Sequence, residues 1–216
     1  MENYLSLFPL NIVLFPEMVL PLHIFEERYK EMIRECLRET EPFGVVYAHN
    51  EEVERVGCRA LITKVAKEYE DGRMDIVTIG ESRFEVVLFD SEKSFLRGVV
   101  TPYEDSEPPE LPDTAEVARL VPLYQEFCRF LSQADEAANL GEVSSFENLV
   151  FRILSRLNVS NDLKQKLLAT HSEKERLTTL LHYFELLLPR LRFAEQAAKR
   201  SRTNGNVYRI ESSSKP

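Results

Sequence analysis

Histidines are the residues of this chain best suited to general acid–base or metal chemistry, and their spacing favours neither. The four histidines are His23, His49, His171 and His182. No two of them are four residues apart, the spacing that places two imidazole ligands on one face of a helix. The carboxylates occur in charge clusters typical of solvated surfaces, and nothing singles out an acid–base pair. We therefore expect structural or surface histidines, no catalytic residue and no metal site.

Glycine spacing likewise argues against a nucleotide-binding loop. The seven glycines form no G-x-G pair and no G-x-x-x-x-G-K-[ST] motif, which phosphate cradles need so that backbone N–H groups can approach the anion. The stretch Gly80–Phe84 matches only the first half of a nucleophile elbow, because Phe84 stands where the second glycine is required. Ser82 is therefore interpreted as a turn residue, and no cofactor is expected.

The three cysteines indicate a reducing compartment. Cys36, Cys58 and Cys128 are far apart and odd in number, so they predict neither a disulfide framework nor a C-x-x-C metal pair. The N-terminus lacks the basic start of a secretory signal, and no run of about 20 apolar residues could span a membrane. We expect a soluble, cytoplasmic protein without membrane contact, in which the cysteines are small core residues.

Net charge disfavours a nucleic-acid partner. Among 216 residues, 27 Lys and Arg stand against 36 Asp and Glu, which gives a formal charge of −9. Nucleic-acid affinity depends mainly on basic side chains that neutralise phosphates. One basic cluster near the C-terminus leaves weak RNA binding open as an alternative, and it consists of Arg190, Arg192, Lys199, Arg200 and Arg202.

Composition divides the chain into two parts, and the helices and strands of these parts would have to position any functional site. Residues 103–113 are acidic and rich in proline, which disfavours helix and predicts an extended linker. We expect a β-rich subdomain at 1–105, the linker at 106–113 and a helical-bundle subdomain at 114–200. Residues 201–216 are polar, and we expect them to form a disordered tail.

Strand patterns dominate the first part and helical patterns the second. About six strands are expected, together with one amphipathic helix over 26–39 and a turn at Asp71-Gly72. Such a set predicts a small, partly closed, barrel-like sheet. After the linker, four apolar stripes at helical spacing predict a bundle, with capping serines at Ser144, Ser160 and Ser172. The expected fold class is therefore α+β.

The strongly apolar block from Leu7 to Leu22 contains three prolines, so it cannot all lie in the centre of a sheet. One interpretation makes its side chains ordinary core. The other places the tip of the block in an exposed loop, since exposed apolar patches mark interaction surfaces. On this second interpretation the polypeptide-binding residues are Phe15, Pro16, Met18 and Leu20.

The same block resembles the opening of the Lon protease N-terminal, substrate-binding domain. The resemblance covers about residues 5–193 and rests on several segments that follow the family's order. These segments are Leu7–Glu26, Arg28-Tyr29, Phe43–Val46, Val56–Cys58, Asp71–Arg73, Gly80–Phe84, Lys164–Leu168 and Glu175–Leu177.

This resemblance implies a PUA-like β pseudo-barrel followed by a helical bundle. It also implies a non-catalytic module that binds unfolded or degron-bearing polypeptides or a partner protein, and it allows self-association. The sequence contains neither the phosphate loop of the Lon ATPase nor the Ser–Lys dyad of its protease, so we expect a stand-alone binding domain. Two alternatives remain. One is an RNA-binding PUA-like protein, and the other is a small-molecule-binding domain of cereblon-like architecture, although no Trp is present to build an aromatic cage.

Overall fold

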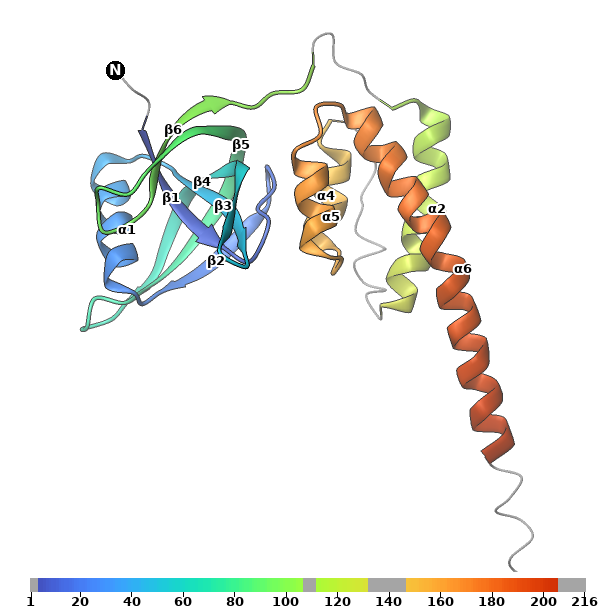
Figure 1. The fold of residues 1–216 in the computed structure, drawn as a ribbon. Helices are drawn as coiled ribbons and strands as arrows, with labels where there is room; N and C mark the ends of the chain where they lie inside the picture. Colours follow the sequence, from blue (N-terminus) through green and yellow to red (C-terminus); the bar gives the residue numbers. More distant parts are fainter. Residues whose placement is uncertain (1–3, 107–111, 132–146, 206–216) are drawn as a thin grey trace, which may run out of the picture. The chain divides into compact units, whose positions relative to one another are not determined.

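The computed structural model describes residues 4–106, 112–131 and 147–205 (Figure 1). Strands dominate up to residue 102 and helices follow from residue 114, which confirms the expected α+β class. In chain order the elements are β1 (Tyr4–Leu10), β2 (Val19–Ile24), α1 (Glu27–Glu39), β3 (Phe43–His49), β4 (Glu52–Glu68), β5 (Met74–Asp90), β6 (Arg97–Pro102), α2 (Thr114–Phe130), α4 (Leu149–Arg156), α5 (Asn161–Leu168) and α6 (Glu173–Gly205).

The chain forms two compact units whose limits differ from those expected from composition. The first unit contains the strands named above together with α1, α4, α5 and residues 173–176 of α6, and the second contains α2 and the rest of α6. The helices expected in one subdomain over 114–200 are therefore divided between the two units. Helices α4 and α5 belong with the strands because α5 accepts a hydrogen bond from Arg83 of β5 and α4 packs Phe151 against Phe15 of the loop that precedes β2.

The ends of the expected subdomains also shift. Helix α6 continues to Gly205, five residues beyond the expected limit at residue 200. The first five residues of the expected tail, 201–205, are therefore helical. Residues 206–216 of that tail and 107–111 of the expected linker lie outside the described residues.

A nearly closed sheet forms the first unit, with strand order β2-β5-β4-β3-β1-β6 and a further pairing between β5 and β6. This pairing joins five strands into a ring and leaves β2 outside it. Strand β2 pairs with residues 74–79 of β5, whereas β6 pairs with residues 84–90 of the same strand. Since β4 lies along the opposite side of β5, β2 and β6 share one edge of β5. The sheet confirms the expected partly closed barrel.

The long strand β5 corrects the interpretation of Ser82 as a turn residue. This strand runs through 17 residues without interruption, and Ser82 lies exposed within it. Glycine is needed at position 80 for a different reason than a turn. A Cβ atom there would lie 2.1 Å from the carbonyl oxygen of Phe15, so the loop before β2 passes directly over the strand.

Prolines lie at the margins of the sheet, as expected. Strand β1 pairs with β6 through residues 4–6, so Pro9 lies beyond that contact and faces only β3 among the described strands. Pro21 lies in β2, outside the closed ring. Residues 11–18 of the same apolar block form an irregular loop, in which the backbone at Glu17 has a φ of 65°.

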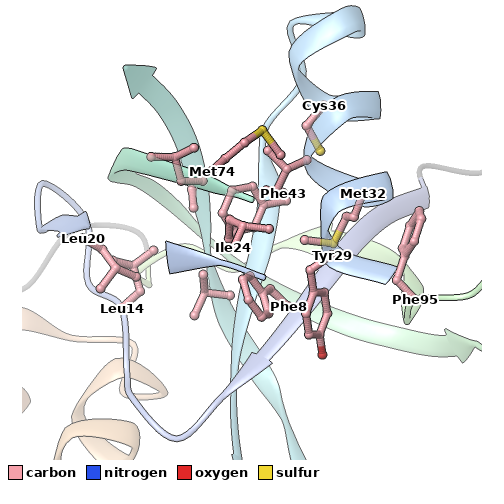
Figure 2. Packing of buried hydrophobic residues seen from close by; sticks show 14 of the residues in the cluster. Phe8, Leu14, Leu20, Ile24, Tyr29, Met32, Cys36, Phe43, Met74 and Phe95 are labelled. Carbon is pink, nitrogen blue, oxygen red and sulfur yellow. The ribbon is translucent and has the colours of Figure 1, made fainter. Parts of the chain in front are cut away.

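Helix α1 confirms the helix expected over 26–39 and covers one end of the sheet. Its side chains Tyr29 and Met32 point into a large buried cluster, where the Phe8 and Tyr29 rings lie 4.1 Å apart between centroids (Figure 2). A second cluster fills the ring itself and consists of Leu5, Leu7, Val46, Phe84, Val86 and Val100. These two clusters make the first unit a rigid support for the loop before β2.

The second unit is built on aromatic packing between α2 and α6. The rings of Phe127 and Phe184 lie 5.0 Å apart, and the guanidinium of Arg119 donates to Glu185 at 2.7 Å. Helix α2 begins with a capping box in which the side chains of Asp113 and Glu116 each bond the other's backbone N–H. The D-x-x-E spacing was visible in the sequence, although we did not expect a cap there.

Cys36 and Cys58 are buried free thiols in the first unit, in keeping with the expected core role. Burial raises the pKa of the Cys36 thiol to about 11 and that of the Cys58 thiol to about 12. Both thiols therefore stay protonated in the folded chain at pH values where an exposed thiol, with a pKa of about 8.5, has ionised.

We predict that folding stability falls as the pH rises above 9. Over this range the unfolded state has released the thiol protons while the folded state retains them, so raising the pH favours unfolding. For Cys58 alone the loss is about 1.4 kcal/mol per pH unit. Urea unfolding at pH 8, 9 and 10 measures this loss. The free energy of unfolding of a Cys58→Ala variant should fall less steeply with pH than that of the unchanged protein. Equal slopes for both proteins would contradict the assignment.

A second prediction concerns the close approach at Gly80. The Gly80→Ala variant must displace the backbone of Phe15, so we expect a loss of about 1–3 kcal/mol in the free energy of unfolding. The control is Ser82→Ala, an exposed position in the same strand, which should change stability by less than about 0.5 kcal/mol. Urea unfolding of both variants distinguishes them, and a neutral Gly80→Ala would show that the loop adjusts freely.

Candidate functional site

The loop over residues 11–18 is fastened to β5 and to the residue that precedes α4. The backbone N–H of Glu17 donates to the Gly80 carbonyl at 2.8 Å, and the Gly80 N–H donates to the Met18 carbonyl at 2.9 Å. The side-chain amide of Asn148 donates to the Glu17 carboxylate at 3.2 Å. These bonds extend the β2–β5 pairing into the loop and fix the tip in place.

The structure places most of the expected polypeptide-binding residues inside the protein. Phe15 is fully buried and stacks on Phe151 of α4, with ring centroids 5.3 Å apart. Pro16 and Leu20 are also buried, whereas Met18 is half-buried. Of the two interpretations of this block, the one that exposes the tip is therefore wrong for Phe15, Pro16 and Leu20, because the loop packs on the core and α4 covers the Phe15 ring. A binding role for these four residues stays a prediction.

A pocket of about 340 Å³ opens beside Met18, between the loop and α4. Two walls of different chemistry meet there, an apolar one from the loop and a basic one from the helix. Its lining consists of Pro16, Glu17, Met18, Val19, Arg152, Ser155 and Arg156. The two arginines are four residues apart and so lie on one face of α4. The pocket thus combines two expected residues, Pro16 and Met18, with helix residues that sequence reasoning missed.

Strand β2 continues from this pocket as an exposed edge. Among the described residues it pairs with β5 on one side and with no strand on the other. Its outward side chains form an alternating row that ends beyond the strand at Phe25, with Val19 59% and Phe25 60% exposed. Pro21 and His23 lie exposed between them. The result is a largely apolar row along a strand whose second edge has no described neighbour.

Backbone directions along β2 follow from two bonds. The Met18 carbonyl accepts from the Gly80 N–H, and the Leu20 carbonyl accepts from the Thr78 hydroxyl at 2.9 Å, so both point towards β5. Because peptide groups alternate along a strand, the N–H and C=O groups of Val19 and His23 point away from β5. Pro21 lies in the same outward set and contributes a carbonyl without an N–H.

His23 is held at the strand edge by a polar cluster. Its Nδ1 lies 2.6 Å from Asp75, and the Tyr69 hydroxyl donates to the same carboxylate at 2.8 Å. The hydrogen bond with His23 is the main reason that the pKa of Asp75 lies below its usual value. This geometry agrees with the expectation that the histidines are structural or surface residues. At His171 the ring stacks on Tyr103 at 4.1 Å, which also indicates a structural role.

A buried ionic cluster joins the helices of the first unit to β5. Arg83 of β5 donates to the carbonyls of Leu168 and Thr170, both at 2.7 Å, and pairs with Asp105. Leu168 is the last residue of α5 and Thr170 follows that helix, so Arg83 binds the carbonyl end of α5. The sequence offered no pattern that linked these residues.

Arg176 completes the cluster from α6. Its guanidinium, 1% exposed, donates to both oxygens of Asp105 at 2.6–2.7 Å and to Glu173 at 2.7 and 2.9 Å. Glu173 in turn accepts the backbone N–H of Val150 at the start of α4, at 2.8 Å. Two arginines and two carboxylates therefore hold α4, α5, residues 173–176 and the chain after β6 on one strand.

Burial and pairing set the charges of this cluster. Burial acts against ionisation of Asp105, but hydrogen bonds and charge from Arg176, with a contribution from Arg83, outweigh it and lower its pKa. For Glu173 burial prevails, and its pKa is raised despite the nearby Arg176. Burial also lowers the pKa of Arg83. Glu173 is thus the member of the cluster that depends most on its partner to remain charged.

Two members of the basic cluster expected near the C-terminus form ion pairs within the second unit. Arg192 donates to Glu126 at 2.7 Å, and Lys199 lies 2.7 Å from Glu195. Within the described ranges, no group of three or more His, Cys, Asp and Glu side chains could hold a metal ion. Nor does any helix in that part of the chain have the length and apolar character to cross a membrane. The absence of catalytic, metal and cofactor sites stays a prediction.

Solved structures share this fold. A Lon N-terminal domain protein from Xanthomonas campestris is 26% identical, with a TM-score of 0.64 over 84% of this chain and 98% of that one. The N-terminal domain of the Mycobacterium avium complex Lon protease, at 16% identity and a TM-score of 0.61, matches in fold. The pseudo-barrel and helices are therefore those of Lon N-terminal domains, the class of fold that the sequence resemblance implied.

Sequence comparison gives the family. A family model for the ATP-dependent protease La (LON) substrate-binding domain matches residues 4–185, and the chain belongs to this family. The Lon protease of Flavobacterium johnsoniae is 28% identical over 204 residues, covering 87% of this chain and 24% of that protein. Lon protease 2 of Syntrophobacter fumaroxidans is 27% identical over 208 residues, covering 91% of this chain and 26% of that protein. The chain spans about a quarter of the length of these curated relatives.

We predict that Arg176→Gln destabilises the fold by about 3–5 kcal/mol, because it leaves the buried carboxylate of Glu173 without its charged partner. This loss in the free energy of unfolding should become smaller as the pH falls from 7 towards about 4.3. The reason is that the folded chain of the variant binds a proton at Glu173 more tightly than the unfolded chain does.

Urea unfolding of this variant at pH 7 and pH 5 tests both statements. Arg119→Gln is the control, because it breaks an ion pair on the surface, and we expect a change of less than about 1 kcal/mol with no such pH dependence. A deficit for Arg176→Gln that widens on acidification would contradict the role assigned to Glu173.

Proposed function

We propose that this chain binds extended, unfolded segments of other proteins along the free edge of β2 and the adjoining pocket. The observation that carries the proposal is the exposed apolar row on a strand that has one described neighbour. Substrates bearing a degron, or one partner protein that presents such a segment, would use the same surface. Binding is proposed without catalysis, and in the cytoplasm.

An extended segment would bind by adding a strand to the sheet. The outward N–H and C=O groups of Val19 and His23 can each exchange hydrogen bonds with a guest backbone, and the Pro21 carbonyl can accept one more. Alternate side chains of the guest would then pack against Val19, Pro21 and Phe25. Backbone bonds of this kind accept many sequences, which suits a binder of unfolded chains.

Family membership supports this proposal, because the family is described as a substrate-binding domain of an ATP-dependent protease. The buried hydrophobic cluster under α1 supports it as well, since Leu20 and Ile24 of β2 belong to this cluster and anchor the strand. A rigid edge reduces the ordering that binding requires on the side of the protein.

The test is fluorescence anisotropy with a labelled, permanently unfolded polypeptide. We predict that Phe25→Asp weakens binding at least about tenfold, because a carboxylate replaces an apolar contact in the row. Met18→Asp, at the pocket end, should weaken it as well. Phe193→Asp is the matched control, since Phe193 is 74% exposed on α6, and it should leave binding unchanged.

The same titration with a single-stranded RNA, at low and at physiological salt, separates the alternatives. Polypeptide binding that persists at physiological salt and responds to Phe25 supports the proposal. Binding of RNA alone, fading as salt rises, would overturn it. Equal polypeptide affinities for Phe25→Asp and Phe193→Asp would show that β2 is not the binding edge.

A further inference from the structure

We infer that His23, with Asp75 behind it and Phe25 beside it, forms a subsite on the β2 edge for a basic side chain of the guest, Lys or Arg. This inference rests on the proposed function and specifies which unfolded segments it favours, namely apolar ones that carry a positive charge. It comes from the ring nitrogen of His23 that the fold leaves available and from the groups around that ring.

The two nitrogens of the His23 ring have different surroundings. Nδ1 lies 2.6 Å from the Asp75 carboxylate, whereas Nε2 forms no hydrogen bond within the described part of the chain. The other contacts of the ring are aromatic, with centroids 6.0 Å from Phe25 in a stack and 5.9 Å from Tyr69 at an edge. The side chain is 45% exposed. Nε2 is therefore the nitrogen that a guest can reach.

Asp75 determines which nitrogen carries the proton. Hydrogen bonds from His23 and Tyr69 lower the pKa of Asp75, so this carboxyl is ionised at neutral pH and can only accept. The proton of the neutral imidazole is therefore assigned to Nδ1, and Nε2 carries the lone pair. A carboxylate on the Nδ1 proton also makes the other nitrogen more basic. In its neutral form His23 thus offers the guest a strong hydrogen-bond acceptor.

The position of His23 in the strand places this acceptor beside a guest side chain. His23 lies on the same exposed face of β2 as Val19 and Pro21. Residues directly opposite each other on paired strands have Cβ atoms about 4.5–5.5 Å apart, and diagonal neighbours stay within reach of a long side chain. A guest residue opposite His23 would therefore lay a Lys or Arg side chain across the imidazole and towards Phe25.

The surroundings of the ring favour a cation in this place. The exposed ring of Phe25 presents an aromatic face, which attracts an ammonium or a guanidinium group. The formal charge of −9 attracts a basic segment at long range.

Nearby charges balance one another, so a neutral His23 leaves no excess of positive charge at the subsite. Lys67 and Arg73 lie over the Tyr69 ring, 4.3 and 4.9 Å from its centroid. The charged groups around the ring form three pairs, which are Asp75 with Lys67, Asp71 with Arg73, and Glu26 with Arg28. The lone pair of Nε2 and the aromatic face therefore decide which guest side chain is preferred.

Protonation of His23 reverses this preference. The imidazolium carries an N–H on both nitrogens, so Nε2 changes from an acceptor into a donor and a positive charge is added. A guest cation is then repelled, and a guest carboxylate is attracted. Lys and Glu side chains of a guest do not themselves titrate over the range in which histidine takes up its proton. A preference that changes with pH thus reports His23 rather than the field of the whole surface.

The experiment uses three labelled nine-residue peptides of alternating Val and Thr, acetylated and amidated, with Lys, Gln or Glu at the centre. Fluorescence anisotropy with the full chain measures their affinities at pH 8 and pH 5.5, at physiological salt. At pH 8 we expect the Lys peptide to bind at least about fivefold more tightly than the Glu peptide, with the Gln peptide between them. At pH 5.5 this ratio should fall to about one or below.

Variants at two exposed histidines assign the effect. His23→Leu removes the acceptor and keeps an apolar side chain, so the ratio between the Lys and Glu peptides should no longer change with pH. His182→Leu, on α6, is the control and should preserve the change. The Gln peptide should bind both variants within about twofold of the unchanged protein, which shows that the fold and the binding edge are intact.

The outcomes separate this inference from the proposed function. If no peptide binds, the proposed function itself fails. If the three peptides bind equally at both pH values and Phe25→Asp weakens the Gln peptide, the binding edge stands and the basic subsite is wrong. A preference for Lys that is unchanged at pH 5.5, or a pH dependence that persists in His23→Leu, would overturn the inference. Loss of the pH dependence in His23→Leu, with the control unaffected, supports it.

Discussion

Two buried guanidinium groups impose the arrangement on which the rest of the first unit depends. A charge removed from water must be surrounded by acceptors, since an unpaired buried ion is strongly destabilising. Arg83 and Arg176 find these acceptors at the carbonyl end of α5 and on Asp105, and Arg176 adds Glu173. The helices must therefore meet β5 in a way that brings all of these acceptors together. Packing of apolar side chains alone would tolerate several orientations of short helices, whereas this set of directional bonds does not.

The position of the cluster explains how the loop and the helices come together. Strands β2 and β6 share one edge of β5, and they leave residues 80–83 between them. At one side of this gap the loop before β2 bonds to Gly80, and at the other side Arg83 holds the helices. The stack of Phe15 on Phe151 closes the space between these two attachments. The pocket beside Met18 is thus a consequence of how β5 is shared by two neighbours.

Much of this fold could be predicted because its signals are local. The periodicity of α1, the turn at Asp71-Gly72 and the prolines at the sheet margins depend on residues close in sequence. The loop tip could not be placed, because Phe15 is covered by a residue 136 positions later in the chain. Gly80 was misread for the same reason, since the atom that excludes a side chain belongs to another segment. The spacing of Arg152 and Arg156 was visible, but nothing in the sequence placed these arginines beside Met18.

The proline at the middle of β2 has a consequence for how tightly a guest can be held. An unpaired strand with all of its amide protons would template further strands, and such edges are where sheet proteins begin to aggregate. Pro21 removes one donor from the outward set, so the edge can accept a single guest but presents an interrupted ladder to another copy of itself. In the proposed binding mode the same interruption would shorten the residence time of the guest, because one backbone bond would be missing at the centre of the contact. Reversible capture and protection against fibril growth would then have the same origin, one missing N–H group.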